Sequence, residues 1–270
     1  MLIAVIFVSA GKMSIAANAT PSDSRDVPVI MYHAIMKDAS RSGKYVITPE
    51  TLRSDIEYIL GKGYTPVFMS DLIDFVNYNG ELPAKPVVLT FDDGYYNNYV
   101  YAYPILKEYG VKAVFSVIGK HTQTASTTGE KQSESYSHVT WDQLKEMSDS
   151  GLWEIQNHTY DMHRTGDKNG ILEVKADTTA KTHELIMEDI RYMQELIYEH
   201  TGKTANTFTY PFGSFDDATQ QLIKDMGFSA TLSCCEGINH IYKGGELTLL
   251  YRYNRAHGKD SKSFFEGILN

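Results

Sequence analysis

Short apolar runs alternate with amphipathic stretches about seven times along the chain. A short apolar run indicates a buried strand, and apolar residues three and four positions apart indicate a helix. Strands are predicted at residues 27–33, 65–68, 86–91, 112–118, 152–156, 206–210, 228–232 and 247–253. Helices are predicted between them at 49–60, 70–78, 141–150, 183–199 and 215–226, with one more ending at Tyr109 and one near Phe264. This alternation predicts a single α/β domain with a parallel sheet, either closed as a barrel or open and doubly wound.

Polar residues mark the ends of these elements. Thr48 followed by Pro49 is an N-cap with proline at the first helical position, and Thr140 caps the helix that begins at Trp141. Residues 119–137 are polar and rich in Ser and Thr, so they are predicted to form a long loop. Long loops in compact domains are often functional.

The N-terminal segment has the features of a secretory signal peptide. Leu2 to Ala10 is apolar and Ala17-Asn18-Ala19 provides a small-residue cleavage pattern, although no basic residue precedes the apolar run. The run is shorter than the roughly 20 apolar residues that a membrane span needs. We expect a signal peptide at 1–19, a linker at 20–26, a domain at 27–270 and a secreted or cell-surface protein. Membrane attachment would require that this N-terminal segment stays uncleaved. The alternative interpretation of the apolar run at 2–10 is a buried first strand.

Charge and cysteine content remove several classes of partner. The 270 residues include 25 Lys and Arg against 34 Asp and Glu, which gives a net charge of -9. Nucleic acids and anionic membrane surfaces select basic patches, so neither is an expected partner. Cys234 and Cys235 are adjacent and cannot easily reach relaxed disulfide geometry, so no disulfide framework is expected.

Candidate catalytic residues follow the ends of predicted strands. Asp92 and Asp93 follow one strand, and His158 follows another, with His163 five residues later in a loop. The carboxyl ends of parallel strands meet at one edge of a sheet, where sites assemble. One carboxylate and two imidazoles suit a catalytic Zn2+, with Co2+ or Ni2+ as alternatives, and a neighbouring carboxylate can take a proton from metal-bound water. Taken singly, Asp92-Asp93-Gly94 is a common turn sequence and each histidine is an ordinary polar side chain.

As a set, these residues resemble a known family. TFDDG at 90–94 and HTYDMH at 158–163 are similar to motifs of the polysaccharide deacetylases that share the NodB homology domain. The resemblance covers nearly all of the chain after the linker, including VPVIMYH, TWDQLKEMSDSG and YPFGSFD. It implies a distorted (β/α) barrel of about seven strands that acts on acetylated sugars.

The same resemblance assigns the central roles. Asp92 would be the catalytic base, and Asp93, His158 and His163 the metal ligands. The five-residue gap between the histidines is similar to the poly-β-1,6-N-acetylglucosamine deacetylases, whereas most of the family has a shorter gap. The expected function is metal-dependent removal of N-acetyl groups from a cell-surface or extracellular amino-sugar polymer. The polymer would be similar to poly-β-1,6-N-acetylglucosamine, or it would be peptidoglycan.

YPFG at 210–213 resembles a motif that lines the family's groove. Tyr210 and Pro211 are therefore expected to contact substrate, and the backbone N–H of Phe212 to stabilise an oxyanion. The family's general acid is a late histidine, for which His257 is the candidate, with an exposed loop position as the alternative.

Two residues near other strand ends are further candidates. His33 ends the first predicted strand and is expected to face the cleft, as a supporting residue or the acid, unless it is a hydrogen-bonded core histidine. Tyr95 is a candidate for sugar contact. The spacing of Tyr96, Tyr99 and Tyr103 favours one buried helix stripe instead.

Two features of the family are missing. Many members have an arginine two residues before the proline of the third motif, where it tethers the base; this chain has Thr209. The aspartate–tryptophan motif of many members is not recognisable at 229–237. The orientation of Asp92 is therefore left unexplained by the sequence.

Four other functions compete with this interpretation. Within the family they are a peptidoglycan or chitooligosaccharide deacetylase and an esterase acting on acetylated xylan. Outside it, a catalytically silent carbohydrate-binding protein would bind glycan without releasing acetate. A non-haem iron oxygenase also uses two histidines and one carboxylate. Its usual order places a histidine just before the carboxylate on a β-rich fold, unlike Asp93 and His158 here.

Overall fold

The computed structural model describes residues 23–129 and 131–269. The predicted signal peptide and residues 20–22 of the predicted linker lie outside the described residues, so the structure does not bear on them. Among the described residues, no helix is both long enough and apolar enough to cross a bilayer.

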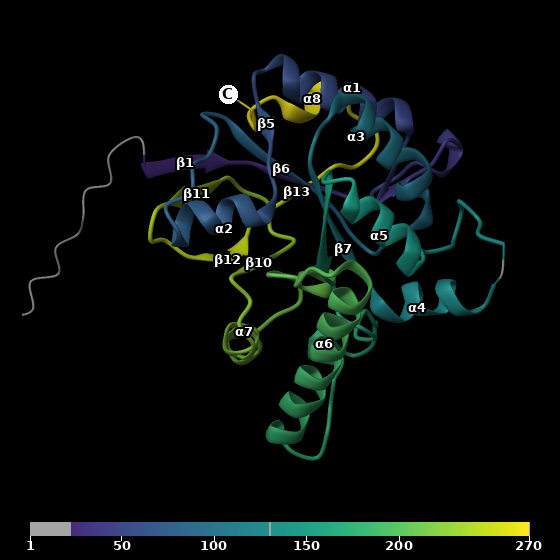
Figure 1. The fold of residues 1–270 in the computed structure, drawn as a ribbon, viewed down its shortest axis with the longest axis vertical. Coiled ribbons are helices and arrows are strands. Elements are labelled where there is room, and N and C mark those ends of the chain that lie inside the picture. Colours follow the sequence, from purple (N-terminus) through teal and green to yellow (C-terminus); the bar gives the residue numbers. More distant parts are fainter. Residues whose placement is uncertain (1–22, 130, 270) are drawn as a thin grey trace, which may run out of the picture.

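In the part of the chain that the structure describes, nine parallel strands form one curled sheet (Figure 1). Along its main path the order is β12-β10-β9-β8-β7-β6-β2-β13, and β5 pairs with the start of β6. The bounds are β2 Val29–Tyr32, β5 Thr65–Pro66, β6 Pro86–Phe91, β7 Ala113–Val117, β8 Trp153–Asn157, β9 Thr207–Thr209, β10 Ala230–Leu232, β12 Leu247–Leu250 and β13 Tyr253–Asn254. Strands that follow one another in the chain are mostly neighbours in the sheet, as in a (β/α) barrel.

The two edges of this sheet are close together in the chain. β12 and β13 lie at opposite ends of the strand order, yet only Tyr251 and Arg252 separate them. The sheet must therefore curl until its edges approach each other, which gives the predicted distorted barrel. The prediction of one strand over 247–253 is wrong, because the chain crosses here from one sheet edge to the other.

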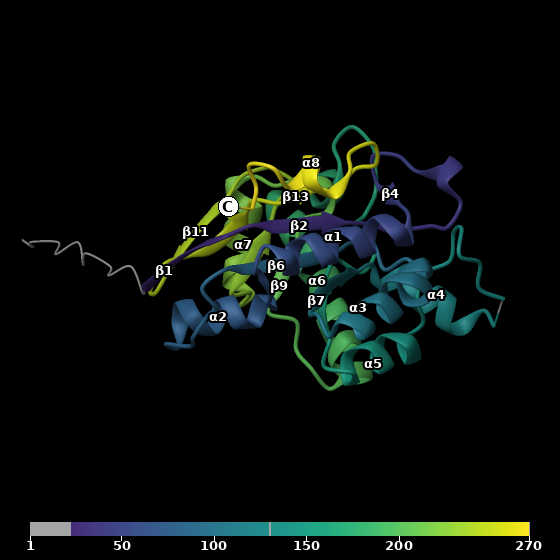
Figure 2. The ribbon, with the colours of Figure 1, turned by 90° about the horizontal axis from the view of Figure 1, so that it is seen from above.

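Helices follow most strands and cover the outside of the barrel. Their bounds are α1 Pro49–Gly61, α2 Met69–Asn77, α3 Tyr103–Tyr109, α4 Gly119–Thr127, α5 Trp141–Asp149, α6 Thr179–Thr201, α7 Asp217–Asp225 and α8 Ser261–Phe265. Short helical turns are η2 Ala39–Arg41, η3 Asn98–Ala102, η4 Gly170–Glu173 and η5 Pro211–Gly213. Figure 2 shows α1, α3 and α5 along one side of the sheet, and Figure 1 shows α6 projecting from the body.

Four short strands pair outside the main sheet. β1 (Ser24–Val27) runs antiparallel to β11 (Asn239–Tyr242), and β3 (Ala34–Ile35) pairs with β4 (Val46–Ile47). The predicted strand at 27–33 is thus divided between β1 and β2 at Pro28, which has no N–H to donate to a ladder.

The helix ends that the sequence predicted are present. The hydroxyl of Thr48 accepts a hydrogen bond from the N–H of Thr51, and Thr140 forms a reciprocal pair with Gln143. Each such cap is worth about 1 kcal/mol.

α4 was not expected, because residues 119–137 were predicted to form a loop throughout. Its residues have no apolar stripe, but three hydroxyls bond back to carbonyls one turn earlier: Thr124 to Lys120, Ser126 to Thr122, and Thr127 to Gln123. Such local bonds satisfy the side chains within the helix. The helix is fixed by its surroundings, which a periodicity argument does not see.

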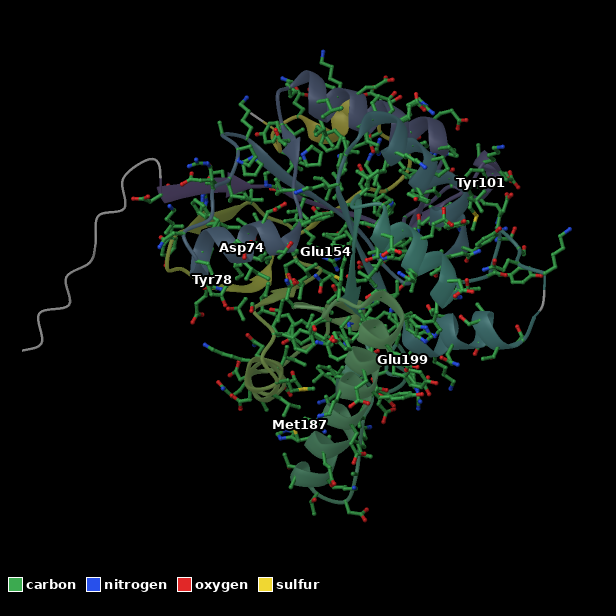
Figure 3. All side chains as sticks on the ribbon, viewed as in Figure 1. Asp74, Tyr78, Tyr101, Glu154, Met187 and Glu199 are labelled. Carbon is green, nitrogen blue, oxygen red and sulfur yellow. The ribbon has the colours of Figure 1, made fainter. Side chains whose placement is uncertain are left out.

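The core lies on both faces of the central strands. Every residue of β6 and β7 is buried, as expected for parallel strands covered on each face. Glu154 is the one residue of the neighbouring strand β8 that is not fully buried. Its carboxylate accepts hydrogen bonds from the N–H groups of Met69 and Ser70. Figure 3 shows Glu154 beside α2, at the end away from Tyr78, where it satisfies the first N–H groups of that helix.

A buried ion pair ties α1 to the end of the barrel. The guanidinium of Arg255 donates to both carboxylate oxygens of Asp55, at 2.8 and 3.1 Å, and both side chains are 0% exposed. The hydroxyl of Tyr32 donates to the same carboxylate at 3.2 Å. Arg255 also donates to the carbonyls of Ala256 and Lys259. This network joins β2, α1 and the segment after β13.

Candidate active site

Three potential ligand atoms meet at the carboxyl ends of β6 and β8. Oδ1 of Asp93 lies 3.5 Å from Nε2 of His158 and 3.3 Å from Nε2 of His163. The three ligand atoms all lie within 4.8 Å of one another. The structure thus brings together the three residues that the sequence proposed as metal ligands.

The backbone at these strand ends adopts left-handed conformations. Asp93 has a φ of 71° and Gly94 a φ of 80°, so the turn after β6 needs two successive residues at positive φ. Asp tolerates this region better than most residues, and Gly does so without cost. Thr159, directly after His158, has a φ of 69°. Uncommon backbone conformations of this kind concentrate at functional sites.

Each histidine is held by a different neighbour. Nδ1 of His158 lies 2.8 Å from the carbonyl oxygen of Thr209, which leaves Nε2 to face Asp93. A backbone carbonyl in this position fixes the ring and its tautomer in many metal sites. The ring of His163 packs on Phe212, with centroids 4.1 Å apart.

The geometry and chemistry fit a divalent metal ion. Oδ1 of Asp93 is buried and has no hydrogen bond of normal geometry among the described residues. A buried carboxylate oxygen without such a bond is costly unless a cation occupies the space in front of it. Two imidazole nitrogens facing that oxygen complete a mixed oxygen and nitrogen donor set that Zn2+, Co2+ or Ni2+ accepts.

Arg252 holds Asp92 beside this cluster. Its Nη1 donates to Oδ1 of Asp92 at 2.9 Å, and both side chains are buried, at 0% and 3% exposure. Nε of Arg252 donates to the carbonyl of Ser233 at 2.7 Å. The orientation of Asp92 is therefore explained by an arginine from the link between β12 and β13. In the family motif Thr209 stands where this arginine was expected.

Sequence reasoning missed Arg252 because it placed this residue inside a continuous strand. The available signal was an arginine in an otherwise apolar and aromatic stretch near the end of a predicted strand. That Asp92 and Arg252 are partners, 160 positions apart, is decided by the closing of the barrel.

The electrostatics keep both aspartates ionised. Burial raises the pKa of Asp92, but the charge of Arg252 and those of nearby histidines outweigh it, so the pKa lies below its usual value. Burial likewise raises the pKa of Asp93, and the contact with His158 and the nearby histidine charges reverse the shift. Burial and the neighbouring His158 lower the pKa of His163 to about 4, so this imidazole is neutral and available as a ligand at neutral pH.

A cavity of about 690 Å³ opens over the site, within the usual range for ligand pockets. The predicted site residues that line it are His33, Asp92, Asp93, Tyr95, His158, His163, Tyr210 and Phe212. Tyr45, Lys44, Glu236 and Cys234 also line it and were not predicted. The hydroxyl of Tyr210 is buried without a hydrogen-bond partner among the described residues.

Two predicted site residues lie elsewhere. His257 is exposed in the segment after β13 and does not line the cavity; its N–H donates to the carbonyl of Gly43. Pro211 is buried, with its carbonyl close to Gly170, and does not line the cavity.

Fold and site together define a (β/α) barrel with an Asp-His-His cluster whose geometry fits a divalent metal and an arginine-held aspartate beside it. The sequence model of the family described as polysaccharide deacetylase matches residues 79–231, which is more than half of the chain. The chain belongs to the polysaccharide deacetylase family.

Curated relatives have related names. The poly-beta-1,6-N-acetyl-D-glucosamine N-deacetylase of Staphylococcus aureus (strain MRSA252) is 29% identical over 185 residues, which cover 68% of this chain and 59% of that protein. The Escherichia coli (strain K12) protein of the same name is 24% identical over 258 residues, covering 89% of this chain and 38% of that protein. The chain thus spans well under two thirds of the length of either relative.

Solved structures agree with this fold. A de-N-acetylase from Aggregatibacter actinomycetemcomitans has a TM-score of 0.75 at 27% identity, covering 89% of this chain and all of that one. IcaB from Ammonifex degensii has a TM-score of 0.72 at 26% identity, covering 86% of this chain and 92% of that one.

Proposed function

We propose that this protein removes N-acetyl groups from a polymer of β-1,6-linked N-acetylglucosamine outside the cytoplasm, with Zn2+ as the metal. The observation that carries the proposal is Asp92, ionised and held by Arg252, beside the Asp93, His158 and His163 cluster at the floor of an open cavity. The names of the S. aureus and E. coli relatives support the choice of polymer. The apolar run and cleavage pattern before residue 20 support export.

The residues of the chain divide the chemistry among them. Asp93, His158 and His163 would hold a divalent metal, which when bound would supply a water of lowered pKa and a Lewis acid for the acetamide carbonyl. Asp92 accepts the proton of the attacking water, and Arg252 keeps its carboxylate oriented and ionised. The N–H of Phe212 donates to the developing oxyanion. Cleavage of the carbon–nitrogen bond then releases acetate and leaves a free amine on the sugar.

His33 is the histidine we assign as the proton donor to that amine. It lines the cavity, whereas His257 does not. Burial lowers the pKa of His33. The charges of Asp92 and Asp93, whose carboxylates lie near its ring, oppose this shift. With a lowered pKa the imidazole is mostly neutral at neutral pH, so His33 has to take up a proton during the reaction before it can donate it to the departing amine.

Two half-exposed rings suit a sugar chain. Tyr45, which is 46% exposed, packs on His33 with ring centroids 4.6 Å apart, and Phe212, which is 40% exposed, packs on His163. Each ring thus lies next to a different site histidine and lines the same cavity. Aromatic rings present a flat apolar face that fits the apolar face of a sugar.

The proposed activity is tested by acetate release from defined oligomers. We expect metal-loaded protein to release acetate from β-1,6-linked N-acetylglucosamine oligomers faster than from chitin oligomers, peptidoglycan fragments or acetylated xylan. Chelation should abolish the release and added Zn2+ should restore it. Fastest release from another substrate would reassign the polymer. Glycan binding without any acetate would indicate a silent binding protein, and metal-dependent oxygen uptake an oxygenase.

A Tyr45→Ala variant tests the contribution of the first ring. The backbone at Tyr45 is held by a bond from the N–H of Ala34 to its carbonyl, so the substitution should leave the loop in place. We expect KM for a β-1,6-linked pentamer to rise about 3- to 10-fold with little change in kcat, as for the loss of one aromatic contact. Tyr78→Ala, at an exposed tyrosine that does not line the cavity, is the control. An unchanged KM would remove Tyr45 from the binding surface.

A further inference from the structure

The loop that carries the two metal-binding histidines has little secondary structure of its own. It runs from His158 at the end of β8 to His163, and its first residues are held from two sides. On one side the N–H groups of Gly119 and Lys120, at the start of α4, donate to the carbonyls of Thr159 and Tyr160 at 3.0 and 2.8 Å. The other side of the loop faces α6.

Gly119 permits the close approach of α4. A Cβ at this position would lie 2.7 Å from the ring of Tyr160 and 2.5 Å from the sulfur of Met193. Any larger residue would push α4 away from the loop. The hydrogen bonds from α4 go to carbonyl groups of the loop. The N–H groups of Tyr160 and Asp161 bond to another partner.

That partner is Asp189 of α6. One carboxylate oxygen accepts the N–H of Tyr160 at 2.7 Å, and the other accepts the N–H of Asp161 at 2.8 Å. Asp189 lies two residues after Met187, which Figure 3 labels on the projecting part of α6. A single side chain thus binds two successive backbone donors in the middle of the interval between the histidines.

Next to Asp189, α6 also holds the start of the loop. The side-chain amide of Asn157 donates to the carbonyl of Ile190 at 3.1 Å, and its oxygen accepts the N–H of Thr159 at 2.8 Å. His158 is independently fixed by β8 and by Thr209. Among the described residues, His163 makes no backbone hydrogen bond to a strand, so its position depends on the path of the loop between Thr159 and His163.

We propose that Asp189 is a positioning residue for the metal centre, which sets the loop path so that Nε2 of His163 faces Asp93. It contacts neither metal nor substrate. Loss of its two acceptor bonds frees the loop at Tyr160 and Asp161 and lets His163 move, while His158 and Asp93 stay in place. This inference concerns metal binding and does not depend on the identity of the polymer.

The test is a Co2+ titration of Asp189→Asn in the absence of substrate. Asn has the shape of Asp but replaces one acceptor oxygen by an NH2 group, which cannot bind a backbone N–H. We expect the Kd for Co2+ to rise about 10- to 100-fold, as for other residues that orient metal ligands. The visible spectrum of the Co2+ form should change even at saturating metal, because one ligand is displaced. Asp189→Ala removes both acceptors and should weaken binding further.

Glu188→Gln is the matched control, because it removes the same charge from the neighbouring exposed position of α6. It should bind Co2+ like the wild type. The decisive comparison repeats Asp189→Asn in a His163→Ala background, where the additional rise in Kd should be under about threefold, since the ligand that Asp189 positions is already absent.

Two results would overturn the proposal. One is a Co2+ Kd of Asp189→Asn within twofold of the wild type. The other is an equal loss of affinity with and without His163, which would show general destabilisation. If Asp189→Ala does not fold, the nearly isosteric Asn variant still decides the question. Because acetate release is not measured, failure here is distinct from failure of the proposed activity.

Discussion

An Asp92→Asn variant is expected to lose about 10²- to 10⁴-fold in kcat for acetate release, the usual contribution of a positioned general base. The amide cannot accept the proton of the attacking water, although it has nearly the same shape as the carboxylate. The metal should remain bound, because Asp93, His158 and His163 are unchanged. Metal content and kcat, measured on the same preparation, separate loss of the base from loss of the metal.

The variant also leaves Arg252 with a buried charge that lacks its ionic partner. Some loss of stability is therefore expected, and thermal unfolding must show that the protein is folded at the assay temperature. Acetate release by folded Asp92→Asn at the wild-type rate would end the assignment of Asp92 as base. A parallel Asp74→Asn variant, at an exposed position of α2, should keep the wild-type rate.

The second large effect concerns stability. Arg255→Met should lower the free energy of unfolding by about 3 to 5 kcal/mol, because it leaves the carboxylate of Asp55 buried without its ionic partner. Burial raises the pKa of Asp55, and the bonds and charge of Arg255 oppose that rise. Without Arg255 the carboxylate must either remain charged in the core or bind a proton on folding. Urea denaturation measures the loss.

Two further variants test this explanation. Asp55→Leu combined with Arg255→Met removes both charges together and should recover much of the stability, since an unpaired charge is then no longer buried. Arg53, also on α1, forms an ion pair with Glu108 of α3, and these side chains are 39% and 57% exposed. Arg53→Met should therefore lower the free energy of unfolding far less than Arg255→Met. Equal losses for Arg53→Met and Arg255→Met would contradict the role given to burial.

Local sequence predicted the elements that depend on local physics. β6 begins at Pro86 and ends at Phe91 as predicted, because six consecutive apolar or β-branched residues before an Asp-Asp-Gly turn favour few alternatives. The caps at Thr48 and Thr140 were equally readable, since a cap is made within one turn of the chain. Tyr96, Tyr99 and Tyr103 lie in contact on one side of a helical segment, as their spacing indicated, but only Tyr103 is buried and the other two are half-buried.

The candidate site also contains residues that local sequence predicted and residues that only tertiary contacts bring to it. Asp93, His158 and His163 could be proposed from sequence, because each lies at or just beyond a strand end and parallel strands carry their ends to one edge. His257, the candidate acid, is exposed and does not line the cavity, which agrees with the exposed loop position kept as its alternative. His33 and Tyr45 were brought to the same cavity by contacts between separate segments.

By itself, then, the sequence determined the strand and helix alternation, the caps, and the residues that gather at the strand ends, since these depend on neighbours within a few positions. Only the tertiary structure decided where the stretch at 247–253 divides, and with it that Arg252 holds Asp92. It also decided that a polar stretch forms α4 and that Asp189 holds the histidine loop. Each of these rests on bonds between segments far apart in the chain, whose energies appear only when the barrel has closed.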